Sequence, residues 1–155
     1  MPKLKEKLKE KIDQHRPRTA KLMKEHGDVV VDQATVAKML GGMRGLKCLV
    51  TDISYLYPYE GIRYRGYTLP EVFEKLPKPP DGDMPYVEGL FYLLLTGDIP
   101  TSEEVEEVID EFRNRRILPK YVYEVIDAYP CCGDPMAILS GAISAMNWES
   151  LFNKK

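Results

Sequence analysis

Two segments in the second half of the chain carry apolar residues at the spacing of an amphipathic helix. In residues 101–112 the apolar positions recur at i, i+3, i+4 and i+7, and Thr101 with Glu104 forms a capping-box pattern ahead of them. Residues 119–129 repeat this spacing, with Pro119 at a position where proline favours the start of a helix. These patterns predict two helices that each bury one face.

Two further helices are predicted to be buried on most of their surface. Residues 87–95 have apolar side chains on nearly every face, and Gly97 closes the segment. Residues 136–148 contain no charged side chain, and Asp134 can cap the helix that they form. A row of small residues runs along this last helix: Ala137, Gly141 and Ala145. Because small residues allow two helices to approach closely, we expect this row to lie at a subunit interface.

Residues with β-forming preference are concentrated in residues 46–68. The runs 46–57 and 61–68 are rich in β-branched and aromatic residues, and Pro58 stands between them. They predict two or three short antiparallel strands, followed by a helix over residues 70–76. The sequence therefore predicts a mainly α fold with one small antiparallel β-hairpin.

Residues 1–31 are predicted to form a charged helical arm. An apolar stripe with four-residue spacing, which needs another surface to lie on, consists of Leu4, Leu8 and Ile12. Pro17 is expected to interrupt this helix, because proline removes a backbone hydrogen bond and clashes with the preceding turn. Asp32 is expected to cap the next helix, which spans residues 33–40.

The charge distribution argues against recruitment of nucleic acid by a strong positive field. The 155 residues include 22 Lys and Arg against 24 Asp and Glu, and 44% are hydrophobic. Up to Lys47 there are 12 basic and 6 acidic side chains, whereas residues 98–111 contain 7 acids and no base. We expect these charges to form solvated helix faces. No apolar run is long enough to span a bilayer, so neither nucleic acid nor a membrane is expected as a partner.

Cysteines and histidines are too few and too scattered to predict a metal site. The cysteines are Cys48, Cys131 and Cys132, and the histidines are His15 and His26. Adjacent cysteines do not bridge easily, so we expect free thiols in a reducing compartment. The first residues mix lysine with glutamate and aspartate, which argues against a secretory or transit peptide. Together these features favour a cytoplasmic location.

The segment GGMRGLK, residues 41–47, places three glycines around Arg44. It lacks the pattern of a P-loop and that of a dinucleotide-binding fingerprint. Two interpretations remain: a sharp turn that happens to carry charge, or a site at which guanidinium and flexible backbone bind an anion. Further along, Arg63 and Arg65 stand among tyrosines that could stack nucleic-acid bases, but a structural role in the sheet is favoured.

Five segments occur in the order and spacing seen in citrate synthases of the type found in mitochondria and some bacteria. They are GGMRGLKCLV, EGIRYRGYTLPE, LPK, EGLFYLLLTGDIPT and DPMAILSGAISAMNWES. From about His26 to its end, the chain therefore resembles the first part of a citrate synthase. It departs from the family pattern where Tyr57-Pro58 replaces aspartate–proline and where Asp134-Pro135 replaces histidine–proline.

The resemblance implies a multi-helical fold in which residues 1–31 are an arm and residues 32–155 are the N-terminal portion of the large domain. It implies a homodimer whose interface includes the helix Met136–Trp148. It also implies an acyltransferase of the tricarboxylic acid cycle that condenses acetyl-CoA with oxaloacetate to citrate and CoA. Acetyl-CoA is then a co-substrate, no metal or permanently bound cofactor is expected, and Arg44 is expected to bind the phosphates of CoA.

The catalytic residues of the family have no match in this chain. In the family, one histidine and an aspartate handle the proton of the acetyl methyl group, and a second histidine polarises the oxaloacetate carbonyl. These residues lie in the family's later two-thirds, so we expect residues 1–155 alone to be inactive. Two alternatives stay open from the sequence: part of a 2-methylcitrate synthase, and a non-catalytic helical interaction module.

Overall fold

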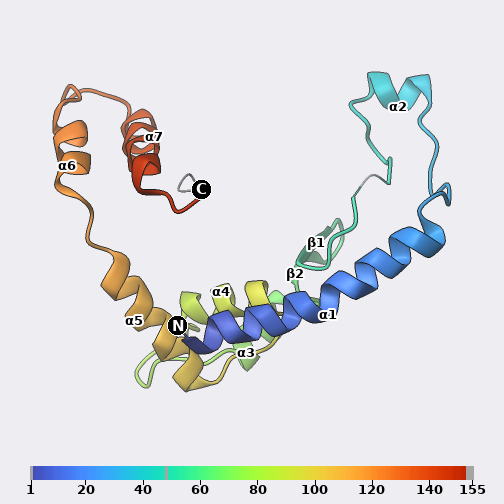
Figure 1. The fold of residues 1–155 in the computed structure, drawn as a ribbon, viewed down its shortest axis with the longest axis horizontal. Helices are drawn as coiled ribbons and strands as arrows, with labels where there is room; N and C mark the ends of the chain where they lie inside the picture. The colour runs from blue at the N-terminus through green and yellow to red at the C-terminus, as the bar shows by residue number, and fades with distance from the viewer. Residues whose placement is uncertain (1, 48, 153–155) are drawn as a thin grey trace. The chain divides into compact units, whose positions relative to one another are not determined.

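The computed structural model describes residues 2–47 and 49–152, which form seven α-helices, one short 3-10 helix and a three-stranded antiparallel sheet (Figure 1). The helices are α1 Pro2–His26, α2 Val36–Leu40, α3 Leu69–Lys75, α4 Val87–Thr96, α5 Ser102–Arg115, α6 Lys120–Asp127 and α7 Pro135–Met146. The strands are β1 Ser54–Tyr57, β2 Gly61–Tyr64 and β3 Tyr67–Thr68, and the 3-10 helix η1 is Asn147–Glu149. The predicted mainly α fold with one small antiparallel β region is confirmed.

The chain divides into two compact units, Met1–Asp110 and Glu111–Lys155. The first unit contains the sheet and most of the buried side chains, and the second contains α6 and α7. The two units are defined by compactness and do not test the expected boundary between residues 31 and 32, which stays a prediction.

The helix α1 runs without a break through Pro17, so the predicted interruption is wrong. Proline at this position lacks the N–H that would otherwise bond to the carbonyl of Asp13. Residues 13–26 are exposed, so water can satisfy the carbonyl that is left without a backbone partner. The local cost of proline is therefore reduced by solvent along this half of the helix.

The first turns of α1 pack on α4 and α5. Leu4 is 4% exposed and forms a buried cluster with Tyr92 of α4 and Val108 of α5. Leu8 packs against the same cluster, whereas Ile12 is 45% exposed. The apolar stripe therefore lies on another surface as predicted, over its first two positions.

The helix α4 is central to the core of the first unit. Its residues Tyr92, Leu93 and Thr96 are buried, and Gly97 ends it in the left-handed conformation with a φ of 82°. The outer side of the helix is open, since Val87 is 76% exposed. The prediction of burial on nearly every face is wrong for that side.

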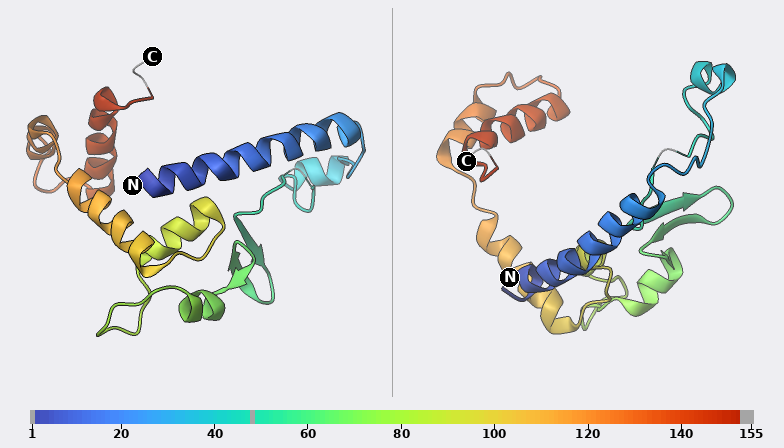
Figure 2. Two further views of the ribbon diagram at one scale, coloured as in Figure 1. Left: turned by 60° about the horizontal axis from the view of Figure 1, so that its bottom comes forward. Right: turned by 45° about the vertical axis from the view of Figure 1, so that its right-hand side comes forward.

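The sheet has the strand order β1-β2-β3 and packs against α3 through β2 and β3 (Figure 2). Arg65 and Gly66 join β2 to β3 with φ values of 50° and 88°. Positive φ at both central residues is the mark of a type I′ turn, whose twist matches that of the flanking strands. The paired residues Tyr64 and Tyr67 pack against the buried cluster that contains Val72.

In the second unit, α6 and α7 pack side by side (Figures 1 and 2). Val122 of α6 and Ala142 of α7 are buried there. A Cβ atom on Gly141 would lie 2.1 Å from the hydroxyl oxygen of Tyr129. At Gly141 the small-residue row is therefore covered by the chain's own Tyr129, and the subunit interface expected along this row stays a prediction.

Candidate functional site

The helix α2 begins after Thr35. The hydroxyl of Thr35 accepts a hydrogen bond from the backbone N–H of Lys38 at 3.2 Å, which is N-cap geometry. The predicted cap at Asp32 is wrong. Thr35 is the N-cap because it stands three residues before Lys38, whose amide would otherwise lack an acceptor.

A Schellman motif ends α2 and explains the first glycine pair. The N–H of Met43 donates to the carbonyl of Lys38 at 2.7 Å, and the N–H of Gly42 donates to the carbonyl of Met39 at 3.3 Å. The motif needs a left-handed residue, and Gly42 supplies it with a φ of 74°. The chain reverses direction immediately before Arg44.

Arg44 lies at the tip of the turn that follows. The N–H of Leu46 donates to the carbonyl of Met43 at 3.2 Å, so Arg44 and Gly45 are the central residues of this turn. Gly45 has a φ of 73°, which a type II turn requires at that position. The interpretation of the glycines as turn residues is confirmed, and an anion site at Arg44 stays a prediction.

Asp32 anchors this loop, which we call the Asp32 loop (residues 32–47). Its Oδ1 accepts hydrogen bonds from Nζ of Lys38 and from the N–H of Gln33, both at 2.7 Å, and its Oδ2 accepts one from the N–H of Lys47 at 3.0 Å. The bond from Lys38, followed by the two amide bonds, lowers the pKa of Asp32 to about 2. A charged carboxylate therefore fixes the two ends of the segment that carries Arg44.

The side chain of Arg44 is exposed, and it makes no ion pair with the residues that the structure describes. A guanidinium presented in this way can bind a phosphate or carboxylate group through two parallel hydrogen bonds. The Asp32 loop thus has the chemistry of an anion-binding turn.

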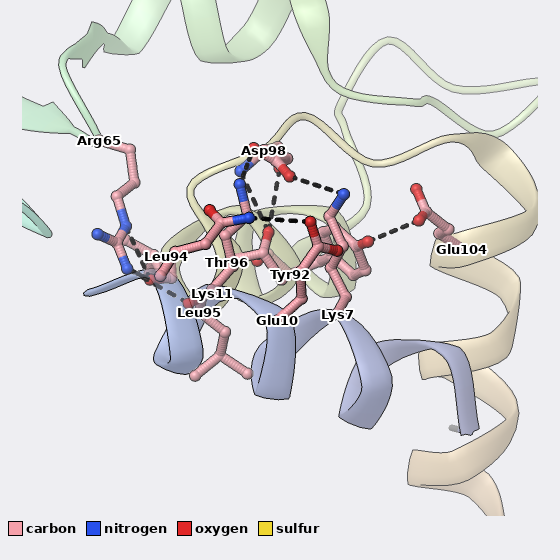
Figure 3. A network of polar contacts seen from close by, with 11 residues as sticks. Lys7, Glu10, Lys11, Arg65, Tyr92, Leu94, Leu95, Thr96, Asp98 and Glu104 are labelled. Carbon is pink, nitrogen blue, oxygen red and sulfur yellow. Dashed lines mark hydrogen bonds and ion pairs between the residues drawn. The ribbon is translucent and has the colours of Figure 1, made fainter. Parts of the chain in front are cut away.

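Arg65 extends from the β2–β3 turn to the C-terminal end of α4 (Figure 3). Its Nε and Nη2 donate to the carbonyl of Leu94 at 3.0 and 2.7 Å, and its Nη2 also donates to the carbonyl of Leu95 at 3.3 Å. Its Nη1 lies 3.2 Å from Oδ1 of Asp52. The last carbonyls of a helix lack intrahelical donors and carry partial negative charge, so the guanidinium stabilises this helix end. The expected structural role of Arg65 is confirmed.

Arg63 is structural as well. Its Nε donates to Glu60 at 2.8 Å, and its Nη1 donates to the carbonyl of Gly66 at 3.0 Å. Both contacts hold the hairpin in shape. The hypothesis that this cluster stacks nucleic-acid bases gains no support from these contacts.

Lysines of α1 contact acids on and near α5. Nζ of Lys11 donates to Oδ1 of Asp98 at 2.8 Å, and Nζ of Lys7 lies 3.3 Å from Oδ2 (Figure 3). The bond from Lys11 holds the pKa of Asp98 below its usual value, although partial burial opposes this effect. Nζ of Lys3 lies 2.6 Å from Oε1 of Glu107. The expectation that these acids form only a solvated face is wrong at Asp98 and Glu107.

A groove of about 810 Å³ lies in the first unit. It is lined by seven side chains of α1, by residues 52–53, by Arg65 and by residues 95–98; those of α1 are Leu8, Lys11, Ile12, Gln14, His15, Arg16 and Arg18. The basic side chains that α1 contributes are Lys11, Arg16 and Arg18. Arg44 does not line this groove, so the two basic features of the first unit are separate.

Neither a metal centre nor a membrane span is found in residues 2–47 and 49–152. No cluster of three or more histidine, cysteine, aspartate or glutamate side chains lies together there as metal ligands would. No helix in these ranges combines the length and the apolar character needed to cross a membrane. Cys131 and Cys132 are free, and Cys48 lies outside the described residues.

Sequence reasoning missed Asp32 as the anchor of the Arg44 turn and Asp98 as the acceptor for α1. Asp32 and Lys47 are 15 residues apart, and no local pattern links them. For Asp98 a signal exists, because the basic excess before Lys47 is opposite in sign to the acidic run over residues 98–111. Attraction between segments of opposite charge predicts that they lie together.

Comparison with known proteins matches residues 42–154 to the family model described as "Citrate synthase, C-terminal domain". Over 151 residues the chain is 46% identical to "Citrate synthase, mitochondrial" of Aspergillus niger and 44% identical to the protein of the same name from Emericella nidulans. Over 149 residues it is 44% identical to "Citrate synthase, mitochondrial" of Xiphias gladius. These alignments cover 96% or 97% of the chain and 32% of each relative. The chain thus spans about a third of the length of the curated relatives that it matches.

The predicted cytoplasmic location is wrong, because these relatives are named as mitochondrial proteins. That prediction rested on free thiols and on acids among the first residues. Free thiols indicate a reducing compartment without identifying which one. The charge pattern of α1 reflects its contacts with Asp98 and Glu107 and is a poor guide to targeting.

We expect the amide signal of Lys47 to titrate with a midpoint of about 2, because Asp32 accepts this N–H and its pKa is lowered to about 2. The lowered pKa stabilises the folded loop fully above the ordinary value of 3.8, and this contribution is lost as the pH falls through about 2. An NMR pH titration measures the midpoint. Asp32→Asn should abolish the titration and Asp28→Asn, a neighbouring exposed acid, should preserve it, whereas a midpoint near 3.8 would contradict the anchoring role.

Proposed function

The chain belongs to the citrate synthase family, and from this premise we propose that the protein condenses acetyl-CoA with oxaloacetate to give citrate and CoA. The proposal rests on the 46% identity to a mitochondrial citrate synthase over 97% of the chain. Because the chain spans 32% of that relative, the activity is proposed for the full-length protein. The names of the relatives also support a mitochondrial location.

In this proposal, residues 1–155 supply scaffold and CoA contacts, and the proton-transfer groups come from elsewhere. Condensation at the acetyl methyl group needs a base at that carbon and an electrophile at the ketone oxygen. His15 lies on α1, where its Nε2 is 3.8 Å from Asp52 and its Nδ1 is 3.2 Å from the hydroxyl of Thr19. His26 is exposed at the last position of the same helix. The groove that His15 lines contains no second histidine that could polarise a carbonyl.

The full-length protein should release CoA from acetyl-CoA only when oxaloacetate is present, as measured with a thiol reagent. Residues 1–155 alone should release no CoA above background. A positioned acid or base contributes about 10²–10⁴-fold to the reaction rate, and these residues have no match for the family's two catalytic histidines and aspartate.

Propionyl-CoA in the same assay tests the alternative, since faster release from propionyl-CoA would favour a 2-methylcitrate synthase. A full-length protein that releases no CoA with either thioester would contradict the proposal and favour a non-catalytic helical module.

We further propose that Arg44 binds the phosphates of CoA. Its guanidinium is exposed on a turn of defined shape. The carboxylate of Asp32 fixes that turn and is ionised at neutral pH, because its pKa is lowered to about 2. A cation held in this way loses less conformational freedom when it meets an anion than one on a mobile loop. Lys47 follows in the same loop and adds a second positive charge.

In the full-length enzyme, Arg44→Ala should raise the KM for acetyl-CoA roughly ten- to a hundredfold with little change in the KM for oxaloacetate. A charge-assisted hydrogen bond contributes about 1.5–3 kcal/mol. Arg44→Lys should recover only part of the loss, because the two-pronged geometry is absent. Arg18→Ala, at an exposed arginine on α1, is the matched control and should leave both constants unchanged. A larger rise in the KM for oxaloacetate than in the KM for acetyl-CoA would contradict the assignment of Arg44 to CoA.

We propose that the protein is a homodimer and that α7 contributes an apolar part of the interface. Met136, Leu139 and Ile143 on one side of α7 are 65%, 49% and 55% exposed. The opposite side, at Gly141, packs on Tyr129. Exposed apolar groups gathered on one helix face are typical of a protein–protein interface.

Ile143→Asp should shift the full-length protein from dimer towards monomer, weakening the dimer at least about tenfold, because an unpaired carboxylate is costly to bury. Ser144→Asp, at the next exposed position of α7, introduces the same charge outside the apolar face and should leave the dimer intact. Sedimentation velocity across a dilution series measures the equilibrium. Equal dissociation of both variants would place the interface elsewhere.

A further inference from the structure

The turn between α6 and α7 presents two adjacent cysteines. The N–H of Gly133 donates to the carbonyl of Pro130 at 2.9 Å, which makes Cys131 and Cys132 the central residues of a β-turn. Both cysteines are free and exposed. A Cβ atom on Gly133 would lie 3.1 Å from the carbonyl oxygen of Pro130 and 3.2 Å from Cδ1 of Ile138, so the turn packs closely against α7. The two thiols therefore belong to one tight corner that is open to solvent.

A disulfide between Cys131 and Cys132 is disfavoured by geometry. Consecutive Cα atoms are about 3.8 Å apart, whereas a disulfide usually joins Cα atoms about 4.4–6.8 Å apart. Strain of this kind makes a disulfide easier to reduce. In a reducing compartment the pair is therefore maintained as two thiols.

A metal ion finds too few ligands at this turn. Structural zinc takes four nitrogen or sulfur ligands, and no third candidate lies with the two cysteines among the described residues. A trivalent arsenic atom with one organic substituent needs only two sulfur ligands. An atom inserted between the two sulfurs also relieves the distance constraint that opposes a direct S–S bond.

We propose that Cys131 and Cys132 together form a binding site for thiophilic ligands that bridge two sulfur atoms, represented by monosubstituted trivalent arsenic compounds. With an arsine oxide, each sulfur forms one As–S bond, the arsenic–oxygen bond breaks, and the two thiol protons leave with the oxygen as water. Arsenic stays trivalent, so the reaction needs neither an oxidant nor a reductant.

Intact-mass spectrometry of the protein treated with phenylarsine oxide tests this site. We expect one arsenical per chain, which resists a monothiol and is removed by dimercaptopropanol. Cys131→Ser and Cys132→Ser should each weaken binding at least about a hundredfold, because the second sulfur acts as an intramolecular ligand. Cys48→Ser is the matched control and should bind as the wild type does.

Alkylation by iodoacetamide, followed by peptide mapping, checks that the remaining turn cysteine stays accessible in each serine variant. An adduct that persists undiminished in Cys131→Ser or Cys132→Ser would overturn the proposal, as would its loss in Cys48→Ser. Wild-type protein that is alkylated at both turn cysteines but forms no arsenical adduct would overturn it too. The readout is the mass of the adduct, so the outcome is independent of CoA release.

Discussion

The contact between Arg65 and the end of α4 sets how the sheet meets the helices of the first unit. The guanidinium bonds the carbonyls of Leu94 and Leu95 and pairs with Asp52, and the left-handed conformation of Arg65 directs it there. The last carbonyls of α4 would otherwise lack partners next to the buried Thr96. One residue therefore closes a hairpin, stabilises a helix end and forms a wall of the groove.

Local sequence patterns predicted helix ends correctly where both hydrogen-bonding residues are close in sequence. They failed where a residue's hydrogen-bond partner is distant in sequence or is solvent. The capping box of Thr101 and Glu104 forms both of its hydrogen bonds, because its members are three residues apart. Pro17 lies inside a helix because the exposed surroundings reduce its cost, which a pattern in the sequence does not report. At the candidate site, the glycines predicted the turn around Arg44. The anchor at Asp32 depends on a contact across 15 residues and had no signature.

The uneven charge of the sequence has a spatial counterpart in the docking of α1. Lys3 pairs with Glu107, and Lys7 and Lys11 both pair with Asp98. Surface ion pairs contribute about 0–1 kcal/mol each, whereas burying a leucine contributes about 1.5–3 kcal/mol. Each ion pair therefore contributes less to the stability of this docking than the burial of Leu4 does.

The sheet ends at β1, whose outer edge has no strand partner among the described residues. Tyr55, Leu56 and Tyr57 on this strand are 58%, 69% and 42% exposed. An open edge with apolar side chains is a template to which another extended segment can add through backbone hydrogen bonds. When residues 1–155 are produced alone, their association through this edge therefore increases with protein concentration. A lysine or proline placed on β1 is the kind of change by which natural sheets keep such an edge from aggregating.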